Sequence, residues 1–71
     1  SYAVSSNLGT LYFIRGKYAD AARMYETALE LNDHDYVVWG NLASAYYWAP
    51  GERDKAAETY RRAITLAEQK Q

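Results

Sequence analysis

The chain has 71 residues and a formal net charge of −1, so it forms one small domain at most and offers no excess positive charge to a phosphate backbone. It contains no cysteine, which excludes disulfide bonds, thiolate metal sites and cysteine nucleophiles. No apolar stretch approaches the ~18 residues of a membrane span, and no signal peptide is recognisable. We therefore expect a cytoplasmic domain that binds neither nucleic acid nor membrane. Because the chain starts at Ser1 rather than at methionine, we expect it to be part of a longer protein.

The first predicted element is a helix from Tyr2 to Arg15, in which apolar residues recur at spacings of three and four. Gly16 follows the last of them and is the expected stop, because glycine commonly ends helices in the left-handed conformation. A second helix is predicted over residues 18–31, where alanine, tyrosine and leucine form one apolar stripe. Residues 32–35 are polar and end this first unit.

A second unit follows in the same order. A third helix is predicted over residues 37–48 and a fourth over residues 56–66, each with helical apolar spacing. Between them, Pro50 disfavours a helical conformation at the residue before it, and Gly51 permits a tight reversal. Short links of this kind force the two helices of a unit to lie antiparallel.

Charged residues suggest how the fourth helix begins. Asp54 is the expected N-cap, because a carboxylate oxygen accepts a hydrogen bond from the free backbone N–H groups of a first turn. Glu58 and Arg62 lie four residues apart, in the order that favours an ion pair along a helix.

The two units are copies of one another. Residues 7–12 recur in outline 34 positions later, and residues 21–31 recur 35 positions later, so one residue is inserted in the turn between the third and fourth helices. Self-similarity at this period is typical of helical repeats, whose units bury their faces against each other. The sequence therefore predicts an all-α fold of two stacked antiparallel helical hairpins, forming a single domain over residues 1–71.

These residues resemble the tetratricopeptide repeat family, whose signature reads W-x-x-L-G-x-x-Y, then A-x-x-x-F, A and a terminal P. The first repeat, over residues 2–35, matches at Leu8, Gly9, Tyr12, Ala21, Tyr25 and Ala28. The second, over residues 36–70, matches at Trp39, Leu42, Tyr46, Ala56, Tyr60 and Ala63, with Ala43 in place of the glycine. Arg53 aligns with the aromatic Tyr18 and departs from the pattern. The resemblance implies a fragment of an α-solenoid with a right-handed superhelix.

Charge is distributed unevenly, because residues 1–14 and 36–51 contain no charged side chain. An uncharged surface helix is either buried on most sides or faces a partner. The resemblance implies that the first helix of each repeat lines a concave groove that binds peptides. Carried over position by position, this predicted groove consists of Ser6, Thr10, Phe13, Ile14, Val37, Gly40, Ser44, Tyr47 and Trp48.

Phe13, Tyr47 and Trp48 are the candidate anchors in the predicted groove, because aromatic side chains in concave sites are frequent hot spots of binding. Two other interpretations stay open: the three rings pack against each other or against further repeats, or they take part in self-association. We therefore carry two functional hypotheses. One is a protein-interaction module that binds a peptide or helix, and the other is a homo-oligomer formed through open repeat ends or exchanged helices.

No pattern in the chain indicates catalysis, a cofactor or a metal. There is one histidine, no glycine-rich phosphate loop and no carboxylate pair on an apolar face, so we expect no enzyme and no cofactor. Asp33, His34 and Asp35 are adjacent in a short link and are poorly placed to converge on one ion. Asn7 and Asn41 are expected to hydrogen-bond the backbone of neighbouring repeats.

Overall fold

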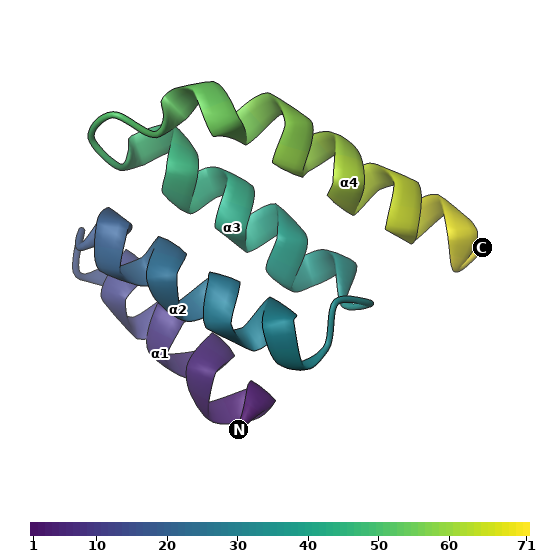
Figure 1. Cartoon of the computed structure of the whole chain (residues 1–71), viewed down its shortest axis with the longest axis horizontal. Helices are drawn as coiled ribbons and strands as arrows, with labels where there is room; N and C mark the ends of the chain where they lie inside the picture. Colours follow the sequence, from purple (N-terminus) through teal and green to yellow (C-terminus); the bar gives the residue numbers. More distant parts are fainter.

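The computed structural model describes all residues, Ser1–Gln71, and contains only helices and their links (Figure 1). In chain order the helices are α1 (Tyr2–Ile14), α2 (Tyr18–Leu31), α3 (Tyr36–Trp48), the short 3₁₀ helix η1 (Arg53–Lys55) and α4 (Ala56–Gln69). The all-α fold class and the four long helices are confirmed, whereas η1 was not predicted. None of these helices combines the length and the apolar character that crossing a lipid bilayer requires.

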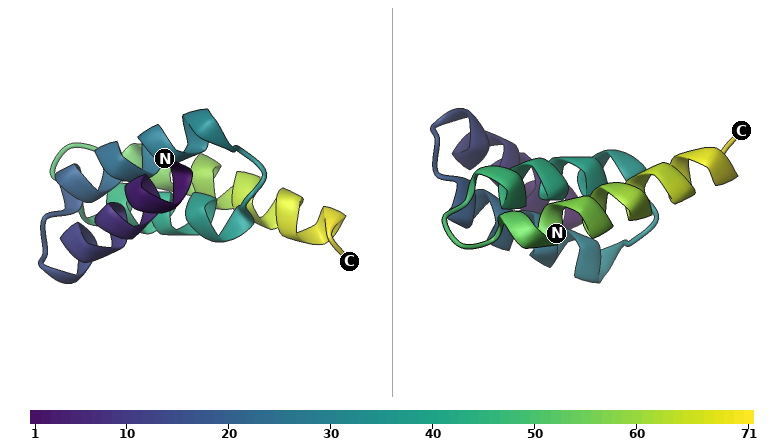
Figure 2. Two further views of the ribbon diagram at one scale, coloured as in Figure 1. Left: turned by 90° about the horizontal axis from the view of Figure 1, so that it is seen from below. Right: turned by 90° about the horizontal axis from the view of Figure 1, so that it is seen from above.

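The helices form two antiparallel hairpins, α1–α2 and α3–α4, which stack with α2 against α3 (Figures 1 and 2). Helices α1 and α4 consequently lie on opposite sides of the stack. Alanines on α2 let the neighbouring helices approach closely, and tyrosine rings fill the space beside them. The core cluster comprises Ala21, Ala22, Tyr25, Ala28, Leu29, Val38, Leu42, Ala45, Tyr46 and Ala56.

The first link has the conformation that Gly16 predicts. Gly16 adopts a positive φ of 76°, and its N–H donates to the carbonyl of Phe13. The N–H of Lys17 donates to the carbonyl of Tyr12 at 2.9 Å, which completes a Schellman motif at the end of α1.

The second link reverses the chain with a different turn. The N–H of Glu52 donates to the carbonyl of Ala49 across Pro50 and Gly51, and Gly51 has a positive φ of 76°. Proline followed by a left-handed glycine is the pattern of a type II turn. Because Gly16 and Gly51 share the same φ, we place the inserted residue before Gly51, and the later positions of the two repeats correspond at an offset of 35.

Helix α4 begins at the predicted residue, Ala56, but the predicted Asp54 cap and the predicted ion pair between Glu58 and Arg62 are wrong. Asp54 lies inside η1, and no side chain caps α4. The reason is that η1 runs directly into α4, so backbone carbonyls of the 3₁₀ turn accept from the N–H groups that a cap would serve. Glu58 and Arg62 form no ion pair. Arg62 instead places its guanidinium carbon 5.6 Å from the ring centroid of Trp39, where the π face attracts it.

Candidate protein-binding face

The predicted groove lies on α1 and α3, and none of its residues is fully buried. Ile14 is 75% exposed, Trp48 55% and Val37 54%, which is high for large apolar side chains. Above Gly40 the surface is open, because an added Cβ would meet no atom within 4 Å. The face is therefore accessible to a partner and is not covered by the chain itself.

The serine and threonine hydroxyls of the predicted groove are engaged within the chain. The Thr10 hydroxyl donates to the carbonyl of Ser6 at 3.2 Å and lies 2.9 Å from the Tyr25 hydroxyl. Ser44 repeats this arrangement in the second hairpin, with its hydroxyl 2.8 Å from that of Tyr60. Ser6 donates to the carbonyl of its own helix at 3.4 Å. These hydroxyls fasten each hairpin internally and leave apolar contact as the main chemistry of the face.

An aromatic row, defined as Phe13, Tyr18, Trp48 and Tyr47, joins the two hairpins. Phe13 and Tyr18 meet edge to face with ring centroids 5.1 Å apart, and Tyr18 lies 6.3 Å from Trp48. Tyr47 and Trp48 form a second edge-to-face pair at 5.0 Å. Phe13 is half-buried against the core, and its ring partner is Tyr18 and neither of the other two candidate anchors. Tyr47 and Trp48 keep exposed surface at the other end of the row.

Two members of this arrangement were not assigned to the site from the sequence. Tyr18 comes from the first turn of α2 and bridges Phe13 and Trp48. Arg53 lies over the Tyr47 ring at 4.2 Å from its centroid, and its Nε donates to the Tyr47 carbonyl at 2.9 Å. The sequence contained one signal for both residues: Tyr18 and Arg53 occupy equivalent positions of the two repeats. Equivalent positions tend to contact equivalent surfaces, so each could have been expected beside the aromatic residues at the end of the preceding helix. The charged residue at this position thus packs on rings much as the aromatic one does.

A charge network, defined as Glu26, Arg23, Glu52 and Lys55, joins α2 to the second link. Arg23 bridges Glu26 at 3.5 Å and also pairs with Glu52, which accepts from Lys55 at 3.0 Å. Burial by itself would raise the pKa of Glu52, but the hydrogen bonds from Arg23 and Lys55 outweigh burial and hold this pKa below its ordinary value. Glu52 therefore keeps its negative charge to more acidic pH than an ordinary glutamate does.

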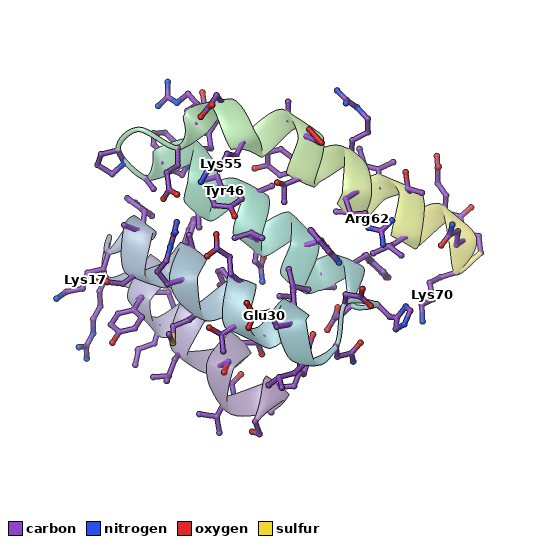
Figure 3. All side chains as sticks on the ribbon, in the orientation of Figure 1. Lys17, Glu30, Tyr46, Lys55, Arg62 and Lys70 are labelled. Atoms are coloured by element: carbon purple, nitrogen blue, oxygen red, sulfur yellow. The ribbon has the colours of Figure 1, made fainter.

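Tyr46 connects this network to the core. Its hydroxyl donates to a carboxylate oxygen of Glu26, and the ammonium of Lys55 lies 5.2 Å from its ring centroid. Figure 3 shows Tyr46 and Lys55 next to each other where α3 meets η1. Burial, and then the hydrogen bond to the Glu26 carboxylate, raise the pKa of Tyr46 well above its ordinary value. The phenol therefore stays protonated and keeps donating.

The cavities of the structure do not lie at the predicted groove. The largest, of about 890 Å³, is lined by Trp39 and Tyr46 together with polar and charged residues of η1 and α4. A second, of about 410 Å³, shares these two aromatics and lies between α2 and α3. None of the nine groove residues lines a cavity. The groove is thus an open face, and Trp39, which the sequence analysis identified only as a position of the repeat signature, lines a hollow that the sequence did not indicate.

The asparagines do not take the role that we expected. Neither the Asn7 side chain nor the Asn41 side chain forms a hydrogen bond within the chain. Both side chains therefore remain available on the two uncharged helices. No three histidine, aspartate or glutamate side chains gather as ligands of a metal ion would.

Comparison with protein families gives one finding. The family model described as tetratricopeptide repeat matches residues 2–69, which is nearly the whole chain. No curated protein and no solved structure matches the chain.

Proposed function

The chain belongs to the tetratricopeptide repeat family, whose repeats mediate protein–protein interactions, and from that premise we propose that the predicted groove binds an apolar segment of another protein. The observation that carries this proposal is the exposure of Trp48 and Tyr47 on a helix without charged residues. Large aromatic side chains that remain accessible while being held by their neighbours are typical anchors of interfaces.

The neighbours of the two anchors favour binding with little loss of freedom. Trp48 is held between Tyr18 and Tyr47, and Tyr47 is held by Arg53, so both rings are positioned before a partner arrives. Holding a side chain in its bound orientation lowers the entropic cost of association. The open surface above Gly40 then leaves room for a partner backbone on the same helix.

The chemistry of the face favours an uncharged, apolar partner segment. Helices α1 and α3 contribute no basic side chain that would select a carboxylate or phosphate, and the serine and threonine hydroxyls of the groove are engaged within the chain. The free amides of Asn7 and Asn41 supply donors and acceptors for a partner backbone. We propose a helix with apolar residues on one side, or a short extended apolar peptide, as the occupant.

A peptide selection with a fluorescent readout tests this proposal. Trp39→Phe leaves Trp48 as the sole tryptophan, so that its emission reports the predicted groove alone. Peptides selected from a display library on the immobilised chain are expected to shift this emission to shorter wavelength, because the bound peptide excludes water from the ring.

The double variant Tyr47→Ala with Trp48→Ala is expected to weaken binding of the selected peptides at least ~30-fold in calorimetry, the effect of losing a hot spot. Tyr36→Ala is the matched control, because Tyr36 has the same 40% exposure as Tyr47 and lies on the same helix outside the predicted groove. Equal binding by the wild type and the double variant would refute the proposed face.

A further inference from the structure

The two outer faces of the stack are exposed copies of the two surfaces that meet inside it. Inside, α2 packs on α3, and residues from both helices share the core cluster. The α2 surface consists of Ala22, Tyr25 and Leu29, and its equivalents on the outside of α4, the α4 face, are Ala57, Tyr60 and Ile64. The α3 surface consists of Val38, Leu42 and Ala45, and its equivalents, the α1 face, are Val4, Leu8 and Leu11.

Exposure separates the inner surfaces from their outer copies. Val38 is 4% exposed, whereas its equivalent Val4 is 57% exposed. Leu29 is 7% exposed, whereas its equivalent Ile64 is 57% exposed. The α1 face and the α4 face are therefore apolar surfaces of the shape that the chain already packs together once.

The charges beside these faces carry a second, independent relation. In the inner interface, the charge network runs Glu26, Arg23, Glu52, Lys55 and alternates in sign. The equivalent positions are Arg61 and Glu58 beside the α4 face, and Lys17 and Asp20 beside the α1 face. Each of these four outer residues has the opposite charge to its inner equivalent, so positive and negative charges alternate in the outer set as well. None of these four outer residues forms an ion pair within the chain.

The inversion makes the two outer faces complementary to each other. If the α4 face of one copy packs on the α1 face of the next as α2 packs on α3, Glu58 meets Lys17 where Arg23 meets Glu52. If the α4 face packed instead on the α3 surface of another copy, Glu58 would meet Glu52, which is a repulsive contact. Figure 3 shows the Lys17 side chain extending away from the body at the first link, free of the rest of the chain.

We propose that this chain binds a second copy of itself head to tail, with the α4 face of one copy on the α1 face of the next. Because the two faces lie on opposite sides of the stack, each added copy presents a new free face (Figure 1). Such heterologous contacts extend into open chains unless the rotation between copies closes a ring. The proposal leaves the predicted groove unoccupied, so it stands or falls separately from peptide binding.

Sedimentation velocity over a concentration series from about 10 µM to about 1 mM, where weak interfaces associate, is the first test. The wild type is expected to grow beyond a dimer as concentration rises. Val4→Glu, which blocks the α1 face, and Ile64→Lys, which blocks the α4 face, are each expected to be monomeric alone. Mixed in equal amounts, they still share one intact pair of faces and are expected to form a dimer that grows no further.

Leu31→Glu is the matched control, because Leu31 has 60% exposure and lies outside both faces and outside the predicted groove. It is expected to associate like the wild type. Circular dichroism checks that every variant remains helical, and dimer formation in the mixture shows in addition that both blocked variants are folded.

A charge swap tests the predicted contact between copies. Lys17→Glu and Glu58→Lys are each expected to weaken association about threefold to tenfold at low salt, because each places like charges together. The double variant is expected to recover the wild-type affinity, since the pair is restored between copies. A structural effect of either substitution on the monomer would not be reversed by the other.

Three outcomes would overturn the proposal. A wild type that remains monomeric throughout the series shows that the faces do not associate. A closed dimer that Val4→Glu abolishes and Ile64→Lys leaves intact shows that two α1 faces pair with each other. Association that neither blocked variant changes points to exchanged helices.

Discussion

Tyr25 and Tyr60 occupy equivalent positions in the two hairpins, yet Tyr25 is 2% exposed and Tyr60 is 39% exposed. Their local surroundings are alike, because each hydroxyl bonds to a hydroxyl on the first helix of its own hairpin, at Thr10 and at Ser44. The difference is that Tyr25 belongs to the core cluster where α2 packs on α3, whereas nothing in the chain packs on the outer side of α4. How much a repeat position contributes to stability therefore depends on whether the next hairpin packs on it, and not on the sequence motif alone.

The largest expected difference between the two hairpins is in the loss of stability when Tyr25 or Tyr60 is replaced by alanine. Tyr25→Ala should lower the free energy of unfolding by about 3–5 kcal/mol, because it leaves a large cavity between three helices. Tyr60→Ala should cost about 1 kcal/mol, since the lost surface is partly solvated already. Urea unfolding followed by circular dichroism measures both values. Equal losses would show that the hairpins are stabilised independently of each other.

Replacing Gly9 on α1 and Gly40 on α3 by alanine is expected to change the stability of the chain in opposite directions. Gly9→Ala should destabilise the chain by about 1–3 kcal/mol, because the added Cβ would lie 2.7 Å from two ring carbons of Tyr25. Gly40→Ala should stabilise it by up to about 1 kcal/mol, because alanine favours the helix and the new Cβ meets nothing. Thermal unfolding of the two single variants suffices, and a loss of stability in Gly40→Ala would contradict the open surface at that position.

The smallest expected effect concerns pH and the inner charge network. The pKa of Glu52 in the folded chain is below its ordinary value of 4.5, so its stabilising contribution is complete above that pH and is lost as pH falls through the folded value. Wild type should exceed Glu52→Gln in stability by less than about 1 kcal/mol at neutral pH. This difference should shrink as the solution is acidified below pH 4.5. A difference that stays constant down to strongly acidic pH would show that Glu52 is not linked to folding.

Much of the fold was accessible from the sequence because it depends on short-range patterns. The helical spacing of apolar residues located all four long helices, and Gly16 ended α1 as expected. The first residue of α4 was predicted correctly, but the turn before it was not, because the choice between a capped α-helix and the 3₁₀ turn η1 depends on how the inserted residue is accommodated. No local pattern around Asp54 distinguishes these two conformations.

The candidate site was only partly accessible. The absence of charge on α1 and α3 directed attention to these two helices, but it did not reveal Tyr18 or Arg53, which contact the candidate anchors from other elements. The predicted groove itself stays a prediction. The hollow beside Trp39 was missed because a tryptophan in a repeat motif appears, from sequence alone, to be committed to packing.

The sequence by itself determined the all-α class, the two repeats and the placement of charge, because periodicity and composition act over single turns and single helices. Only the tertiary structure decided which copies of a repeated residue are buried, how the insertion is absorbed, and which charges pair. Those outcomes depend on contacts between hairpins, where α2 and α3 meet once while α1 and α4 each keep an outer face.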